Sequence, residues 1–419
     1  MVEYQERFAD KILQRSLNTF GAVILQGPRA VGKTTTAKVA AASSIRLDAS
    51  PQRAALAETS PSTILQGDVP RLIDEWQLAP SIWNAVRHEV DERSGKGHFI
   101  LTGSATPADD VTRHSGAGRF RRITMRPMSL AESGESTQQV SIKSILEQGG
   151  IAGFGGPTVA EYAELIVRGG WPELVTSSSA VVSDYLESYL DDVARVDLAA
   201  TAVDTDPARM NALIRALARN VSSEVSIVKL ATEADIISQG QGPQDRGTVR
   251  RYLDALERIF VLEEQPAWST HLRSKIRLRV QPKWHFVDPS LAAAAIQASP
   301  EKLLEDLNTF GFLFESLAIR DLRIYAEHHR GHVYHYRDSS DLEVDAIIEF
   351  RDGRWIGIEV KMGGQAQIEL AASNLSKLKG KLSEQRAAQN IGLVVMTAGE
   401  TSYSRDDGVM VISLGHLTA

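Results

Sequence analysis

The stretch AVILQGPRAVGKTTTAKVAAAS, at residues 22–43, decides the fold of this chain. Its middle, Gly27–Thr34, fits the pattern G-x-x-x-x-G-K-[ST] and lies between an apolar, strand-like run and a helical run. Gly27 and Gly32 allow a loop to wrap closely, so that backbone N–H groups and the start of the helix face phosphate oxygens. The pattern predicts a phosphate-binding loop. The alternative, a chance match within a glycine-rich turn, is disfavoured by the flanking strand and helix.

We expect this loop to bind ATP together with Mg²⁺. In such a loop the lysine, here Lys33, meets the β- and γ-phosphates, and the hydroxyl of Thr34 is a ligand of the magnesium ion. The candidate nucleotide-binding residues are Gly27, Pro28, Arg29, Ala30, Val31, Gly32, Lys33, Thr34 and Thr35.

A second apolar strand, Arg71–Ile73, delivers Asp74 and Glu75 at its carboxyl end. In an open α/β sheet the ligand lies outside that end of the strands. Asp74 is therefore a second candidate for holding magnesium, and Glu75 is the candidate base that orients or deprotonates the attacking water. An acidic pair that only starts a loop is the alternative reading.

Two further residues are candidates for catalysis. Ser104 follows the strand-like run 99–102, where its hydroxyl could sense the γ-phosphate or the attacking water. Arg119 lies in the basic stretch GRFRR at 118–122, and an arginine at the γ-phosphate would spread the charge of the transition state. A solvated basic face is the alternative for Arg119.

The composition sets limits on the function. With 419 residues the chain is expected to form two to four domains, and 43% hydrophobic and 24% charged residues are ordinary globular values. Cysteine is absent, which excludes disulfides and thiolate chemistry, and no apolar run reaches the roughly 18 residues of a membrane helix. We expect a cytoplasmic protein without a membrane partner. The net charge of −7 confines any nucleic-acid site to a local basic surface.

The pattern along the chain predicts three α/β and helical modules. Buried strands at 22–25, 44–48, 71–74 and 98–104 alternate with helical stretches, which is typical of a parallel sheet covered on both faces. The glycine-rich stretch 149–157 is expected to be a connection. Helices followed by a strand between about 210 and 262 favour a winged-helix-like part. The expected domains are 1–148, 158–300 and 301–419.

The last module carries a set of acids and a lysine. Asp345 lies in the strand EVDAII, and Glu359 and Lys361, two residues apart on the next strand, share one face. Together with Glu315 on an upstream helix, they form the D…E-x-K arrangement of nucleases of the restriction type, in which carboxylates hold Mg²⁺ and the lysine acts on the attacking water. A solvated pair of surface charges, or a fold of this type without activity, is the alternative.

Basic residues alternate with apolar ones near residue 276, a pattern that sends four cations to one face of a strand. Such a stripe would suit DNA phosphates. An edge strand kept soluble by charge is the alternative. The candidate DNA contacts are Arg273, Lys275, Arg277 and Arg279, with Arg250 and Arg251 on the preceding helix.

The motifs GPRAVGKTT, LIDEWQ, ILTGSAT and GR in this order, with GGWPE at 169–173, resemble those of a family of bacterial and archaeal AAA-type ATPases of unassigned role. The resemblance covers nearly the whole chain. It implies an AAA ATPase domain with Walker A at Lys33 and Thr34, Walker B at Asp74 and Glu75, and a sensor at Ser104. It also implies a C-terminal domain of unknown function, similar to a winged helix followed by a fold of the restriction-endonuclease type.

Three functions follow as hypotheses. The first is an ATPase that acts on or with DNA. The second is a nucleotide-gated module that binds a protein partner, with a silent D…E-x-K site. The third is an ATP-regulated, Mg²⁺-dependent DNA nuclease. Each is compatible with an oligomer, in which an arginine could act across a subunit boundary.

Overall fold

The computed structural model describes residues 4–105, 116–147, 149–197, 206–238, 245–270 and 280–419. The chain forms two compact units. The first unit comprises Met1–Arg126, Val193–Thr205 and Arg251–Val261, and the second comprises Pro127–Asp192, Asp206–Arg250 and Leu262–Ala419. No helix in the described ranges is long and apolar enough to cross a membrane.

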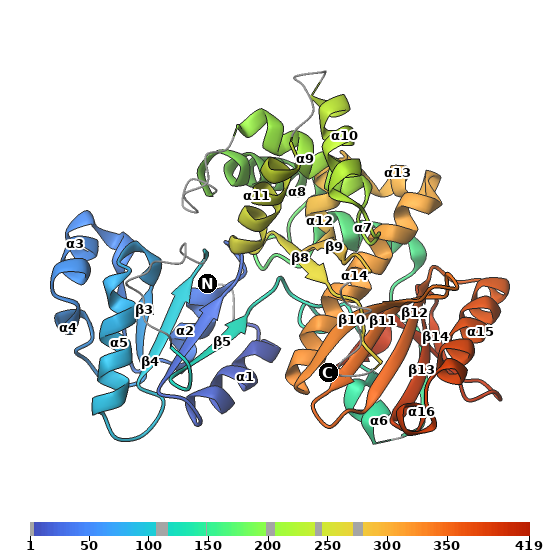
Figure 1. Cartoon of the computed structure of the whole chain (residues 1–419), viewed down its shortest axis with the longest axis horizontal. Helices are drawn as coiled ribbons and strands as arrows, with labels where there is room; N and C mark the ends of the chain where they lie inside the picture. The colour runs from blue at the N-terminus through green and yellow to red at the C-terminus, as the bar shows by residue number, and fades with distance from the viewer. Residues whose placement is uncertain (1–3, 106–115, 148, 198–205, 239–244, 271–279) are drawn as a thin grey trace. The chain divides into compact units, whose positions relative to one another are not determined.

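The first unit is built on a five-stranded sheet in the order β2-β3-β4-β1-β5. Figure 1 labels β3, β4 and β5 of this sheet. All neighbouring strands in it run parallel. This confirms the predicted parallel sheet of a P-loop fold. The strands are β1 (Ala22–Gln26), β2 (Ser43–Arg46), β3 (Arg71–Asp74), β4 (Phe99–Gly103) and β5 (Phe120–Thr124).

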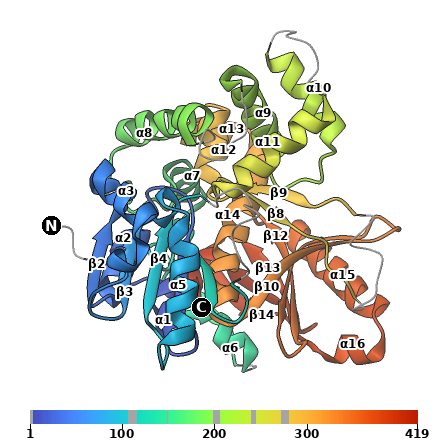
Figure 2. The same ribbon diagram turned by 60° about the vertical axis from the view of Figure 1, so that its left-hand side comes forward.

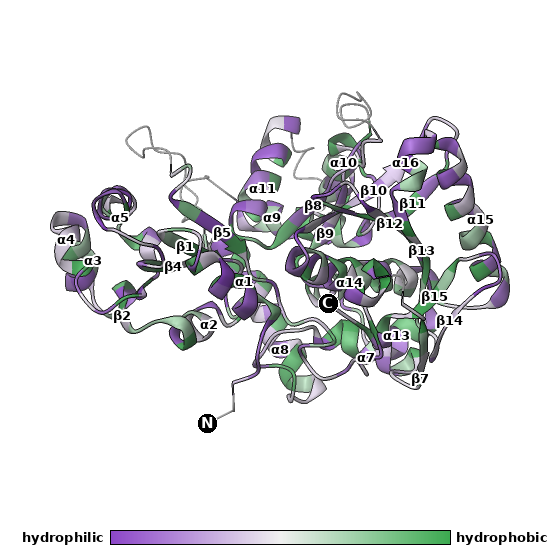
Figure 3. Cartoon of the chain, turned by 90° about the horizontal axis from the view of Figure 1, so that it is seen from below, coloured by the Kyte–Doolittle hydropathy of each residue, from purple (hydrophilic) through white to green (hydrophobic). Residues whose placement is uncertain are grey.

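Helices cover both faces of this sheet (Figure 3). Alternate residues of a strand point to opposite faces, and one set, which includes Ile24, Ile73 and Leu101, packs against apolar side chains of α3, α4 and α5. Helices α1 and α2 pack on the other side. The helices are α1 (Phe8–Leu17), α2 (Lys33–Ala40), α3 (Pro51–Thr59), α4 (Pro61–Ile64) and α5 (Ser81–Glu92).

The second unit contains a mixed seven-stranded sheet in the order β10-β11-β12-β13-β15-β14-β7. Helices α14 and α15 lie on opposite faces of it (Figures 1 and 2). The strands are β7 (Ala152–Phe154), β10 (Gly331–Arg337), β11 (Glu343–Phe350), β12 (Trp355–Lys361), β13 (Asn390–Thr397), β14 (Thr401–Ser404) and β15 (Met410–Ser413). Two smaller sheets pair β6 (Val140–Ser141) with β16 (Leu417–Thr418) and β8 (Leu262–Gln265) with β9 (Lys283–Phe286).

Helices make up the rest of this unit, and α11 continues from it into the first unit. They are α6 (Ile142–Leu146), α7 (Val159–Arg168), α8 (Ser179–Asp192), α9 (Pro207–Arg219), α10 (Ile227–Ile237), α11 (Arg246–Arg258), α12 (Pro289–Ala295), α13 (Pro300–Glu305), α14 (Leu307–His328), α15 (Gln365–Lys381) and α16 (Glu384–Ala388). The order α9, α10, α11, β8, β9 is the one in which we expected a winged-helix-like part, an assignment that stays a prediction.

The interpretation of residues 149–157 as a connection was wrong. Strand β7 lies within this stretch and pairs antiparallel with β14, with Phe154 opposite Thr401. Three residues are too few for a visible alternation of apolar and polar side chains, so the sequence gives no strand signal there. The stretch is therefore part of the edge of the C-terminal sheet.

A buried ion cluster explains the glycines of the GGWPE motif. Arg320 donates to Asp288 at 2.8 Å and lies 2.7 Å from Asp321, and all three side chains are buried. Asp288 also accepts a hydrogen bond from the backbone of Gly170 at 3.0 Å. A Cβ atom at Gly170 would lie 2.1 Å from the carbonyl oxygen of Met128. The motif therefore allows a close approach of backbones around paired charges.

Candidate functional site

The loop 27–32 joins the carboxyl end of β1 to the first residue of α2. Gly27 has φ 151° and Gly32 has φ 90°, both outside the range that other residues readily adopt. A Cβ atom at Gly27 would lie 2.1 Å from the carbonyl oxygen of Met125. Both glycines are therefore needed for the path of the loop, which leads directly into the first turn of α2, the part of a helix whose N–H groups bind phosphate in such loops.

Lys33 and Arg7 hold the loop in shape. The Lys33 side chain is buried, and its ammonium group donates to the carbonyl oxygen of Pro28 at 2.6 Å. Arg7, also buried, donates from Nη1 to the carbonyl oxygen of Val31 at 3.0 Å and from Nη2 to that of Arg126 at 2.8 Å. The loop thus folds around an ammonium group, and an arginine from before α1 supports its outer side.

Asp74 lies at the centre of a set of oxygen atoms next to the loop. The Thr34 hydroxyl donates to Asp74 Oδ1 at 2.8 Å, and the Thr102 hydroxyl donates to the same atom. Parallel pairing places Thr102 of β4 directly opposite Asp74 of β3. On its other side Arg46 Nε lies 3.6 Å from Asp74 Oδ2. Asp74 is 1% exposed, so strand pairing and hydrogen bonds fix this carboxylate inside the protein.

This donor set fits a magnesium ion. Mg²⁺ prefers hard oxygen ligands, usually one or two from the protein, and completes its shell with water and phosphate oxygens. The Thr34 hydroxyl and the Asp74 carboxylate are already in contact with each other beside the loop. The two residues that the sequence assigned to the metal are therefore brought together.

Glu75 follows Asp74 in a left-handed backbone conformation, with φ 59° and ψ 42°. Gln77 Nε2 donates a hydrogen bond to Glu75 Oε2. Burial raises the pKa of Glu75, and the hydrogen bond from Gln77 and the charge of Lys33 only partly offset this. Glu75 is therefore an oriented carboxylate that holds a proton more strongly than an ordinary glutamate.

Ser104 comes directly after β4 and is half-buried. Gly103, the last residue of β4, pairs with Gln26 at the end of β1, so Ser104 lies at the same edge of the sheet as the phosphate-binding loop. A Cβ atom at Gly103 would lie 2.6 Å from Gln77 Oε1. The close packing of Gly103 against Gln77 links the end of β4 to the residue that orients Glu75.

Arg119 does not lie at this edge, and its assignment to the γ-phosphate within one chain was wrong. Strand β5 is parallel to β1, and Phe120 pairs with Ala22, so Arg119 lies at the amino end of the strands. A five-residue strand, roughly 16 Å long, separates it from the loop. Arg119 instead donates to Asp91 Oδ1 at 2.7 Å, and this hydrogen bond is the main reason why its pKa is raised. Within this chain Arg119 forms a surface ion pair with Asp91, and action across a subunit boundary stays a prediction.

The four residues predicted for the C-terminal site do come together. The ammonium group of Lys361 lies 2.7 Å from Glu359 Oε2 and 3.1 Å from Asp345 Oδ2. Asp345 also accepts a hydrogen bond from the backbone of Val360 at 2.8 Å. A residue that the sequence did not single out, Lys283 of β9, links this group to Glu315 of α14 at 2.9 Å.

Most charged groups of this cluster are buried, and they shift one another's pKa values. Burial opposes ionisation of Asp345, but Lys361 and Lys283 outweigh it and lower the pKa of that carboxyl group. Burial raises the pKa of Glu315 and of Glu359, more than the lysines lower it. Within the described ranges no group of three or more histidine, cysteine, aspartate or glutamate side chains is arranged to hold a metal ion.

The predicted DNA contacts fall largely outside the described residues. This is the case for Arg273, Lys275, Arg277 and Arg279. Arg250 and Arg251 are exposed on α11.

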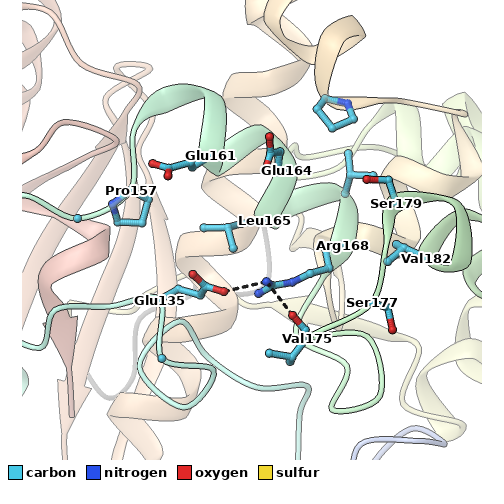
Figure 4. A pocket seen from close by; sticks show the side chains of 14 residues that line it. Glu135, Pro157, Glu161, Glu164, Leu165, Arg168, Val175, Ser177, Ser179 and Val182 are labelled. Carbon is cyan, nitrogen blue, oxygen red and sulfur yellow. Dashed lines mark hydrogen bonds and ion pairs between the residues drawn. The ribbon is translucent and has the colours of Figure 1, made fainter.

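A pocket of about 450 Å³ lies beside α7 in the second unit (Figure 4). Its lining is polar, with Glu135, Glu161, Glu164 and Arg168. Arg168 donates to Glu135 at 2.8 Å and to the carbonyl oxygen of Val175 at 3.2 Å. Arg168 and Glu135 thus pair with each other, and none of the residues of the phosphate-binding loop lines this pocket.

Family models match three successive parts of the chain. An AAA domain matches residues 19–134, and two domains of unknown function, DUF8612 and DUF4143, match residues 159–302 and 310–417. The chain thus carries a P-loop domain of the AAA type. It combines this domain with a C-terminal domain of unknown function, as the sequence motifs led us to expect.

Relatives and solved structures were also found. Two uncharacterized proteins, from Mycobacterium tuberculosis and Mycobacterium bovis, are each 24% identical over 413 residues, covering 97% of this chain and 83% of their own. A Walker-type ATPase of Pyrococcus abyssi is 12% identical with a TM-score of 0.41, covering 70% of this chain and 96% of its own. The Orc1 protein of Aeropyrum pernix in complex with DNA is 9% identical with a TM-score of 0.28, covering 73% and 95%.

Proposed function

We propose that this chain is an Mg²⁺-dependent ATPase. The observation that carries the proposal is the buried Asp74 carboxylate, which accepts hydrogen bonds from Thr34 and Thr102 at the edge of the sheet where the phosphate-binding loop begins. A P-loop next to a strand that ends in such an acid is the arrangement that cradles a triphosphate and its metal ion.

Each residue of this site has a role in the proposal. The N–H groups of the loop and the Lys33 ammonium bind the β- and γ-phosphate oxygens. Thr34 and Asp74 hold the magnesium ion, which when bound neutralises charge on those oxygens. Glu75 accepts a proton from the attacking water, and Gln77 keeps its carboxylate oriented. Ser104 contacts the γ-phosphate or the attacking water, a role that its position at the same edge of the sheet supports.

Hydrolysis is tested with the variant Glu75→Gln and a matched control. The amide retains the shape of the side chain and cannot accept the proton, so turnover should fall by about 10²-fold or more while ATP binding persists. Glu89→Gln, partly buried on α5 and paired with Arg93, changes the same functional group away from the site and should leave turnover unchanged. Normal turnover by Glu75→Gln would refute the assignment of the base.

DNA is one of the two macromolecular partners that the sequence allows, the other being a protein, and the ATPase assay can test it directly. The exposed pair Arg250 and Arg251 on α11 supports this arm within the described residues. If DNA is a partner, duplex DNA should raise the ATPase rate, and Arg250→Ala with Arg251→Ala should reduce that increase without changing the basal rate. A rate that does not respond to DNA would favour the nucleotide-gated module that binds a protein.

A further inference from the structure

Lys283 lies at the centre of the acids of the C-terminal domain. Its side chain is 2% exposed, and its ammonium group lies 2.7 Å from Glu343 Oε1, 2.9 Å from Glu315 Oε1 and 3.7 Å from Asp345 Oδ1. These acids come from α14 and β11, whereas Lys283 comes from β9. One cation from a separate element thus reaches three carboxyl groups.

Strand β9 holds this lysine in place. The backbone of Lys283 pairs with Gln265 of β8 and forms an isolated β-bridge with Glu224. The Gln265 amide donates to the carbonyl oxygen of Asp345 at 2.9 Å, which ties β8 to the strand that carries the acid. The pairing of β9 with β8, together with the hydrogen bond from Gln265 to Asp345, therefore fixes the position of the ammonium group.

We infer that Lys283 is the resident cation of this cluster and that it closes the D…E-x-K site to divalent metal ions. In a site that cleaves nucleic acid, the carboxylates that correspond to Glu315 and Asp345 would be free to hold Mg²⁺. Here the Lys283 ammonium contacts both, and Lys361 is paired with Asp345 and Glu359. A metal ion would have to displace a buried charge from all of its partners at once.

Charge supports this inference. The two ammonium groups face four carboxyl groups, those of Glu315, Glu343, Asp345 and Glu359. Glu315 and Asp345 raise the pKa of Lys283 by more than burial lowers it. Asp345 and Glu359 do the same for Lys361, so both lysines stay charged. The cluster is thus supplied with cations by the chain itself. This inference concerns a site separate from the phosphate-binding loop and does not depend on ATP hydrolysis.

The test is the binding of Mn²⁺ to the whole chain in the absence of nucleotide. Binding is measured by electron paramagnetic resonance, which detects the Mn²⁺ that stays free. Lys283→Met keeps most of the length of the side chain and removes its charge. We expect Lys283→Met to bind one additional Mn²⁺ per chain, at least ten-fold tighter than the native chain, and to lose it when Asp345→Asn is added. Lys379→Met, an exposed lysine on α15, is the control and should bind Mn²⁺ as the native chain does.

Two results would overturn the inference. One is a folded Lys283→Met variant that gains no Mn²⁺ site. The other is a native chain that already binds Mn²⁺ and loses it in Asp345→Asn. If Lys283→Met does not fold, as judged by circular dichroism, the comparison of the native chain with Asp345→Asn and Glu359→Gln decides alone. Equal Mn²⁺ binding by the three supports the inference, and loss in either variant overturns it.

Discussion

Thr102 and Asp74 lie directly opposite each other on the parallel strands β4 and β3, and the Thr102 hydroxyl donates to the carboxylate oxygen that also accepts from Thr34. Thr102 is fully buried. A threonine of the neighbouring strand therefore positions the acid that we assign to the metal ion.

Replacing Thr102 with valine removes this donor at nearly constant volume. Loss of a hydrogen bond to a buried carboxylate should destabilise the chain by about 1–3 kcal/mol, because the oxygen is left short of a partner. It should also raise the Mg²⁺ concentration at which the ATPase rate is half-maximal. Thr59→Val, at the exposed end of α3, should change neither. An unchanged Mg²⁺ requirement in Thr102→Val would contradict the role of Thr102 in positioning Asp74.

Gly27→Ala tests the shape of the loop. The new Cβ atom would lie 2.1 Å from the carbonyl oxygen of Met125, at a φ of 151° that alanine does not readily adopt. Either the loop or Met125 must move, so ATP binding should weaken at least ten-fold and stability should fall. In Gly311→Ala the added methyl group meets nothing within 4 Å in helix α14, and stability should stay equal or rise. Binding is measured by calorimetry and stability by thermal unfolding.

The raised pKa of Glu75 predicts the acid side of the pH–rate profile. A base acts only when ionised, and burial delays ionisation of Glu75 to a higher pH than an ordinary glutamate needs. As the pH is lowered, the rate should therefore fall with a midpoint above the usual pKa of a glutamate. Gln77→Leu removes a hydrogen bond that lowers this pKa, so the midpoint should move to higher pH. A midpoint that is the same in both proteins would contradict the contact between Gln77 and Glu75.

Breaking the buried ion cluster of the second unit should be costly. Arg320→Met leaves Asp288 and Asp321 buried without their cation, and removal of one partner from such a pair costs about 3–5 kcal/mol. The urea midpoint of the second unit should fall sharply. Unfolding is monitored by the fluorescence of Trp171, whose indole N–H donates to the Ser290 hydroxyl at 3.0 Å. Arg405→Met, in a partly exposed pair with Glu369, should move this midpoint far less. Similar midpoints for both variants would show that the cluster contributes little.

The sequence predicted the phosphate-binding loop and its sheet because apolar strands alternate with helical periods there. It could not place Arg119, since the order and direction of strands in a sheet depend on contacts between distant residues. Strand β5, with two arginines among its five residues, reads as a basic stretch and not as a strand next to β1. The same reasoning applies to Thr102, whose neighbour on β3 is set by sheet order.

Three of the four acids of the C-terminal cluster, Glu315, Asp345 and Glu359, were predictable from their spacing on two strands and a helix, whereas Glu343 was not singled out. Lys283 was not predictable, because a single lysine in the four-residue strand KWHF has no periodic partner. Its contacts lie 32 residues away at Glu315 and further away on β11. A lone lysine among aromatic residues is the signal that could have drawn attention to it, since lysine is rarely buried without a paired acid.

The most direct test of the central claim is calorimetric titration of the folded chain with ATP in the presence of Mg²⁺. We predict that the native chain and Glu75→Gln bind one ATP per chain with similar affinity. Lys33→Ala removes the ammonium group that lies within the loop, and it should bind ATP at least 100-fold more weakly. Equal heats of binding for the native chain and Lys33→Ala, or no heat with either, would contradict the assignment of the nucleotide site.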